Sequence, residues 1–167
     1  MNNFSKKIIK IISDFQIASS AQFLSGPLPP RAENETRYVV TWTLSNSANT
    51  ILQAQARAAL PIYVKWVGLQ KATSEDISYN ETTREVIWNI GTVRSNTGFT
   101  SNREATFVIA LTPSLSQAGS VPQLMKDLYL SGQDSFANTI IKTSRGPITT
   151  LLTNDPSFKY GDERVIK

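Results

Sequence analysis

The stretch Tyr38-Val39-Val40-Thr41-Trp42-Thr43-Leu44 decides the fold class of this chain. Its large side chains recur at every second position, and a β-strand places residues with that spacing on one face. The residues between them are all β-branched, which suits a pleated, half-buried surface. The stretch therefore predicts a strand whose buried face carries Tyr38, Val40, Trp42 and Leu44.

Similar short segments follow, separated by turn residues. Residues 52–60 alternate, with Leu52 at the start of the apolar face, and they stop at Pro61; residues 77–88 indicate a hairpin with a polar loop at 80–83. Further strands are expected at 62–67, 105–111, 128–130, 139–141 and 148–152. Without amphipathic helices between them, these strands predict an all-β fold, an immunoglobulin-like antiparallel β-sandwich of about seven to nine strands. Its core should also hold Val86, Trp88, Phe107, Ile109 and Leu111.

Residues 1–22 have a different pattern, which predicts a short amphipathic helix or leader. Phe4, Ile8, Ile11 and Phe15 fall on one helical stripe, with lysines elsewhere. A lysine and an aspartate interrupt the apolar patch, so it makes a poor signal peptide, and no apolar run is long enough to span a membrane. The stripe has three possible partners: this domain, a preceding domain, or a membrane surface.

The predicted helix is followed by a proline-rich linker and first edge at 23–35, where Pro27, Pro29 and Pro30 cannot pair in a central strand. The sandwich domain is expected at 36–153 and a polar tail at 154–167.

Composition argues against catalysis and cofactors. The 167 residues include no histidine and no cysteine, which removes imidazole bases, thiol nucleophiles and zinc or iron–sulfur ligation. The net charge of +4 is spread singly along the chain, whereas nucleic-acid-binding proteins concentrate positive charge on one face. We expect no enzyme activity, no metal or cofactor, and no nucleic-acid partner.

Acidic residues give the nearest catalytic candidates. The pairs Glu75-Asp76 and Glu81 with Glu85 flank the predicted hairpin, where a solvated loop edge is expected rather than a glycosidase cleft. Asp155 and Asp162-Glu163 lack the spacing of a calcium loop, so a solvated tail is expected there.

The three tryptophans and Lys65 each have a functional and a purely structural interpretation. Trp42, Trp66 and Trp88 can form a carbohydrate platform, but their strand positions favour the core. Lys65 alternates with Tyr63 and Val67, which predicts partial burial, and a buried lysine in such a sandwich can cross-link to an asparagine or aspartate. An exposed lysine with a snorkelling stem is the ordinary alternative.

Several short motifs in a fixed order resemble the conserved-repeat, immunoglobulin-like domain known as domain of unknown function number eleven. In order, they are the strand 38–44 with Asn46 after it, Leu60-Pro61, Trp88-Asn89-Ile90-Gly91, and the strand 107–111 with Thr112-Pro113. The resemblance covers roughly residues 27–152; one departure is Asn34, where the family tends to have glycine.

This resemblance implies a non-catalytic structural or adhesive module of a bacterial cell-surface or secreted protein, next to other domains or a surface ligand. The alternative is a module that binds a carbohydrate or peptide at one end of the sandwich, on the polar loops 45–50, 69–76 and 92–103.

Overall fold

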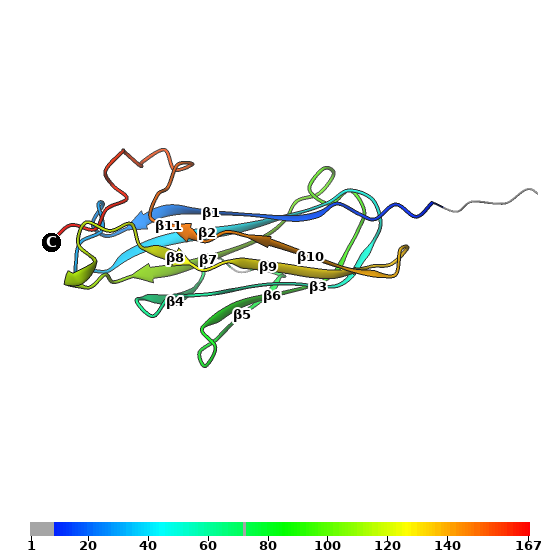
Figure 1. Cartoon of the computed structure of the whole chain (residues 1–167), viewed down its shortest axis with the longest axis horizontal. Coiled ribbons are helices and arrows are strands. Elements are labelled where there is room, and N and C mark those ends of the chain that lie inside the picture. Colours follow the sequence, from blue (N-terminus) through cyan, green and yellow to red (C-terminus); the bar gives the residue numbers. More distant parts are fainter. Residues whose placement is uncertain (1–8, 72) are drawn as a thin grey trace, which may run out of the picture.

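Two antiparallel sheets packed face to face make up the body of the protein (Figure 1). The structure is a computed structural model and describes residues 9–71 and 73–167. One sheet has the order β1-β2-β7-β4, the other β10-β9-β3-β6-β5, and a small third sheet pairs β11 with β8. The strands are β1 (Phe15–Ser25), β2 (Thr36–Asn46), β3 (Ile51–Ala59), β4 (Val64–Leu69), β5 (Asp76–Asn80), β6 (Glu85–Val93), β7 (Arg103–Leu111), β8 (Gln123–Met125), β9 (Leu128–Asp134), β10 (Thr139–Arg145) and β11 (Ile148–Thr149). The predicted all-β sandwich is confirmed.

Strand β2 lies between β1 and β7 and has the predicted buried face. Tyr38, Val40, Trp42 and Leu44 are fully buried. The Trp42 ring meets Phe107 of β7 edge to face, with 5.1 Å between ring centroids, a favoured geometry for an aromatic pair. The other residues predicted for the core, Val86, Trp88, Phe107, Ile109 and Leu111, are also buried.

Strand β3 is a strand as predicted, but its first buried residue is not Leu52. Gln53 has a positive φ of 51°, and the pairing with β6 shifts between Ile51 and Ala54. This bulge reverses the faces before it, so Ile51 is buried whereas Leu52 is 37% exposed. Beyond the bulge, Ala56 lies opposite Trp88 of β6, and its small side chain leaves room for the indole.

The helix predicted for residues 1–22 is wrong for the residues that the structure describes. The only helical turn in 9–71 and 73–167 is a short 3-10 turn (Leu115–Gln117), and residues from Phe15 onward form β1. Phe15 and Ile17 are buried on alternate positions of β1, because pairing with β2 decides its conformation. Ile11 is exposed, while Phe4 and Ile8 lie outside the described residues. The linker expected at 23–35 therefore begins inside a strand.

The segment 154–167 is not a solvated tail. Asp155, Glu163 and Val165 are buried. The Ile166 N–H donates to the Pro30 carbonyl (2.9 Å), and the Ile166 carbonyl accepts from Ala32 N–H (2.8 Å). These backbone contacts fasten the segment to the loop between β1 and β2.

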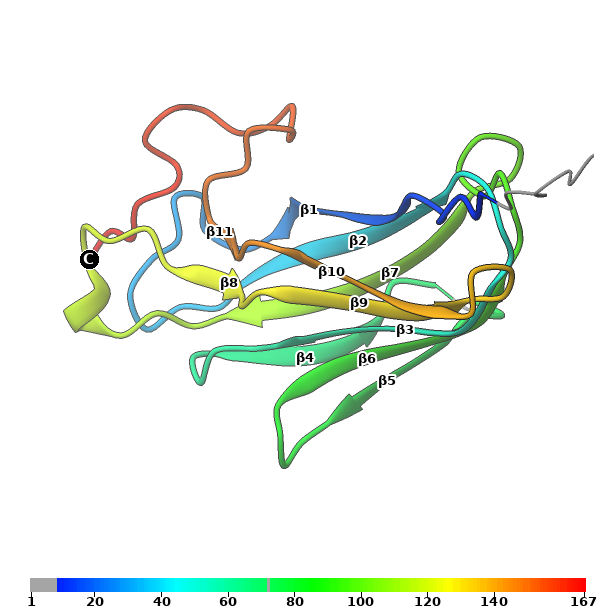
Figure 2. The same cartoon turned by 45° about the vertical axis from the view of Figure 1, so that its right-hand side comes forward.

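The chain enters the sandwich at one end of its long axis and leaves near the other (Figures 1 and 2). Residues 9–14 approach β1 at the first end, and Lys167 lies beyond β8 and β11. Among the described residues there is no helix of sufficient length and hydrophobicity to cross a lipid bilayer.

Candidate functional site

A buried carboxylate fastens the end at which the chain enters. Asp134, the last residue of β9, accepts hydrogen bonds from the backbone N–H groups of Ser13 (2.9 Å), Phe136 (3.0 Å) and Ala137 (2.9 Å). The side-chain amide of Asn49 also donates to it, at 2.9 Å to the nearer oxygen. We call Ser13, Asn49 and Asp134 the entry lock.

The Asp134 carboxylate of the entry lock strongly favours its ionised form. Burial raises the pKa of the Asp134 carboxyl, but the hydrogen bonds from Ala137, Asn49, Ser13 and Phe136 outweigh burial and leave this pKa well below its usual range. The carboxylate thus stays ionised and holds the incoming residues of one sheet against a strand of the other.

A second carboxylate fastens the opposite end of β1. Asp155 accepts a hydrogen bond from the Phe23 N–H (2.6 Å) and others from the N–H and hydroxyl of Ser157. Burial raises the pKa of Asp155, but these hydrogen bonds together lower it below its ordinary value. We call Asp155, Phe23 and Ser157 the exit lock.

The free edge of β1 is covered by side chains from β10. The Thr143 hydroxyl donates to the Phe15 carbonyl (3.1 Å), and the Arg145 Nε donates to the Ile17 carbonyl (2.9 Å). These bonds join edge strands of the two sheets and satisfy backbone acceptors that have no strand beside them.

A partly buried ion pair joins the two sheets near their other side. Arg103 of β7 binds Glu75 through two bonds, of 2.8 and 2.6 Å, and the Trp88 indole N–H of β6 donates to the same carboxylate at 2.9 Å. The Arg103 guanidinium also donates to the carbonyl of Ile90 (3.1 Å). This arrangement satisfies the indole of a fully buried tryptophan.

The acidic residues singled out in the sequence do not form a catalytic pair. Glu75 is held by Arg103, whereas Asp76 accepts from the Asn89 amide (3.0 Å) on the sheet surface. Glu81 and Glu85 lie at the turn between β5 and β6 and show no ion pair among the described residues. Residues 9–71 and 73–167 contain no group of three or more carboxylates suited to a metal ion.

The structure separates the three tryptophans and exposes the lysine. Trp42 and Trp88 are in the core, and half-buried Trp66 of β4 stacks on Tyr79 of β5, with centroids 5.8 Å apart. There is thus no platform of three rings. Lys65 is exposed rather than partly buried, because the inward-facing residues of β4 are Val64 and Trp66. An exposed lysine does not meet the burial that the proposed cross-link requires.

Two of the three loops considered for ligand binding meet at the entry end. The Asn46 amide at the start of loop 45–50 donates to the Asn49 carbonyl (2.7 Å) and to the Arg94 carbonyl of loop 92–103 (3.0 Å). The Asn46 amide therefore makes its hydrogen bonds within and between these two loops, which leaves it less able to bind a ligand. Loop 69–76, of which residue 72 is not described, sends Glu75 inward.

Sequence reasoning missed the entry lock and the role of Arg103. Asp134 and Asn49 are 85 residues apart, and neither stands in a motif. The one available signal was Asp134 itself, an acidic residue that follows the predicted strand at 128–130 and stands just before a turn.

No protein-family model and no curated protein matches this sequence. The resemblance to domain of unknown function number eleven therefore has no support from a family model. Among solved structures, a variant of BcpA, the major pilin subunit of Bacillus cereus, matches with a TM-score of 0.50 and 10% identity, over 81% of this chain and 40% of that one. The full-length major pilin SpaD of Corynebacterium diphtheriae matches with a TM-score of 0.49 and 8% identity, over 80% of this chain and 34% of that one. The chain thus spans less than half of each pilin, and the BcpA likeness shows a shared fold.

Proposed function

We propose that this chain is a non-catalytic, immunoglobulin-like structural module that carries tension within a larger bacterial surface protein. The observation that supports this most is that residues 9–14 and Lys167 lie at opposite ends of the long axis (Figure 1). A module inserted in this way adds its full length to a row of domains. Strands β1 and β2, with 11 residues each, span about 35 Å at about 3.3 Å per residue.

The pairing of β1 gives the geometry that resists an axial pull. Strand β1 runs along the long axis and pairs with β2 from Phe15 to Ser25. A pull along that axis loads these backbone hydrogen bonds together, in shear. The entry lock, the exit lock and the β10 side chains hold β1 from its other side.

Several observations support a non-catalytic role outside the cell. The lowered pKa values of Asp134 and Asp155 suit structural acceptors, because a general acid needs a proton to give near neutral pH. Burial raises the pKa of Tyr38, so its hydroxyl stays protonated. The pilin that shares the fold is a bacterial surface subunit, and the partial coverage of it fits one domain among several.

The alternative is that the loops at one end of the sandwich bind a carbohydrate or peptide, so that the module serves in adhesion and not in spacing. It has less support, because Asn46 already joins two of those loops.

Single-molecule pulling tests the proposal, and the absence of cysteine makes attachment simple. One variant carries Ile9→Cys and Lys167→Cys and is pulled along the axis. The other carries Ile9→Cys and Ser135→Cys, both at the entry end, so that bonds open one after another. We expect a clearly higher unfolding force for the axial pair. Equal forces for the two pairs would refute the proposal.

A further inference from the structure

The outer face of the five-stranded sheet carries a groove that the structural role does not use. It has a volume of about 560 Å³ and lies over β3, β9 and β10. Six of its eight lining residues occupy alternate, outward-facing positions of these strands: Gln55, Arg57, Tyr129, Ser131, Lys142 and Ser144. The size falls within the usual range of about 300–1,000 Å³ for ligand pockets.

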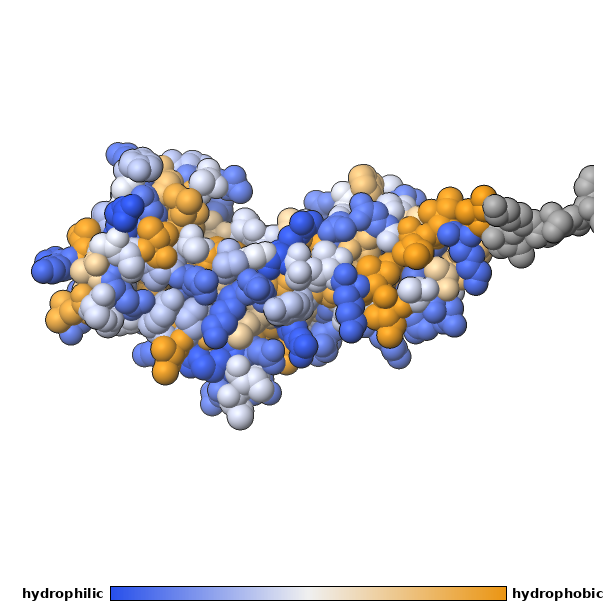
Figure 3. Space-filling model, viewed as in Figure 1, coloured by the Kyte–Doolittle hydropathy of each residue, from blue (hydrophilic) through white to orange (hydrophobic). Residues whose placement is uncertain are grey.

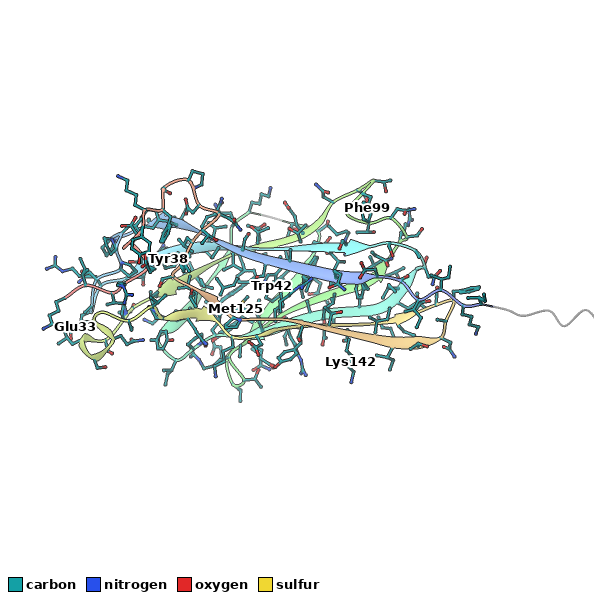
Figure 4. All side chains as sticks on the ribbon, turned by 45° about the horizontal axis from the view of Figure 1, so that its top comes forward. Glu33, Tyr38, Trp42, Phe99, Met125 and Lys142 are labelled. Atoms are coloured by element: carbon teal, nitrogen blue, oxygen red, sulfur yellow. The ribbon has the colours of Figure 1, made fainter. Side chains whose placement is uncertain are left out.

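Two cations of the groove lack acidic partners. Arg57 and Lys142 are exposed, and neither is in an ion pair within the part of the chain that the structure describes. Lys142 extends from β10 away from the core, in which Trp42 lies (Figure 4). The two residues sit on strands separated by β9, which places their Cα atoms roughly 10–12 Å apart at the usual strand spacing.

An aromatic ring stands next to Arg57 and diagonal to Lys142. Tyr129 of β9 is 52% exposed, and the register places it directly between Arg57 of β3 and Ser144 of β10. A half-exposed tyrosine offers an apolar face for the C–H side of a sugar ring and a hydroxyl for hydrogen bonding.

Uncharged polar side chains complete the groove in a row across the sheet. The register aligns Asn89, Gln55, Ser131 and Lys142 on neighbouring strands. The Gln55 amide nitrogen donates to the side-chain oxygen of Asn89 (2.8 Å), which fixes the amide of this groove residue and leaves its own oxygen able to accept a hydrogen bond. Ser131 and Ser144 can both donate and accept, as sugar hydroxyls require.

The charged residues around the groove determine whether it favours an anionic or a cationic ligand. Arg145, which follows Ser144 of the groove, donates hydrogen bonds to the Ile17 carbonyl and to the Gln16 side chain of β1. Two acids, Glu85 and Asp127, line a separate hollow that shares Tyr129 with the groove, together with Lys126. A third acid, Asp76, accepts a hydrogen bond from the Asn89 amide at the end of the polar row, which engages one of its oxygens. Hydrophilic side chains predominate on the face over β9 and β10, in contrast to the hydrophobic cluster at the entry end (Figure 3).

We propose that this groove binds an acidic oligosaccharide. Arg57 and Lys142 contact its carboxylate or phosphate groups, Tyr129 packs against a sugar ring, and Gln55 and the serines bind hydroxyls. Arginine suits this role because its planar guanidinium matches a carboxylate or phosphate in a bidentate manner. This function is independent of tension bearing, since every residue involved points away from the core.

Isothermal titration calorimetry of the full chain tests the proposal with four probes. These are trigalacturonic acid, a phosphorylated maltotriose, neutral galactotriose, and inorganic polyphosphate as a charged ligand without sugar. We expect one or both acidic sugars to bind at least about tenfold more tightly than the neutral sugar and the polyphosphate. Whichever acidic sugar binds more tightly identifies the anionic group.

The variants Arg57→Gln, Lys142→Gln and Tyr129→Ala should each weaken that binding about tenfold or more, because a hydrogen bond to a charged group is lost or the ring is removed. Arg94→Gln is the matched control: its side chain is exposed on loop 92–103, away from the groove, and it should bind as the parent does. Unchanged thermal unfolding checks that the variants are folded. No binding of either acidic sugar at millimolar concentration, equal binding of polyphosphate, or an equal loss in Arg94→Gln would overturn the proposal.

Discussion

Replacing Asp134 by asparagine tests how much the entry lock stabilises the fold. The Asp134 Oδ1 accepts from Phe136 and Ala137, and an asparagine oxygen can keep both of these bonds. The new amide nitrogen would face the Ser13 N–H and the Asn49 amide, which are donors themselves. Two hydrogen bonds to a charged group are lost, at about 1.5–3 kcal/mol each, so unfolding free energy should fall by about 3–6 kcal/mol.

That loss is large against a total stability of about 5–15 kcal/mol, and it is measurable by urea unfolding at pH 7. Asp127→Asn is the matched control, because Asp127 is exposed and shows no hydrogen bond among the described residues; its midpoint should not move. A loss below about 1 kcal/mol for Asp134→Asn would show that solvent replaces the lost bonds and that the lock is not stabilising.

The same carboxylate predicts how stability depends on pH. The pKa of Asp134 is lower in the folded protein than in the unfolded chain, where it is about 3.9. The unfolded chain therefore takes up a proton first as pH falls, so the stabilisation present above about pH 4 declines progressively below it. Asp155, whose pKa is also lowered, adds to this decline. Wild-type protein should lose more stability than Asp134→Asn between pH 7 and pH 3 in urea unfolding; parallel curves would contradict the assignment.

Three further changes test the packing. Trp88→Ala should lower the free energy of unfolding by about 3–5 kcal/mol, because it empties a core position and leaves Glu75 without its indole donor. Urea unfolding monitored by circular dichroism measures this loss, and a loss below about 1 kcal/mol would place Trp88 at the periphery. Gly132→Ala should cost about 1–3 kcal/mol in the same assay, since the added Cβ would collide with Ile51; an unchanged midpoint would contradict that close contact. Deleting residues 1–22 should abolish cooperative thermal unfolding, because it removes most of β1, and a sharp transition in the truncated chain would argue against this.

Sequence periodicity was sufficient to predict a strand and its buried face where a single local pattern was present. The alternation around Trp42 predicted both a strand and its buried side, since a two-residue period has no competing interpretation there. In β3 the same reasoning failed at Leu52, because the bulge at Gln53 depends on how β3 meets its neighbours.

The N-terminal error came from two periodicities in one segment. Phe15 and Ile17 alternate as strand residues do, yet Phe15 also continues a helical stripe through the isoleucines before it. Pairing with β2 settles the conformation, and no local propensity carries that information. The same limit applies to the entry lock: Asn49 and Asp134 meet only once β3 and β9 have paired.

The closure of the β1 edge has a consequence for the chain during its synthesis. The groups that cover this edge, Thr143 and Arg145, lie 128 residues after their partners in β1, and Asp155 lies 132 residues after Phe23. At about 5–20 residues per second, a ribosome needs roughly 6–25 s to make that interval. Once β2 has also been made, the nascent chain can pair β1 with β2 while the opposite edge of β1 stays open to another chain, as in edge-to-edge aggregation. Slow translation or crowded expression should therefore harm this protein before its last quarter is made, and a chaperone that shields the edge of β1 should improve its yield.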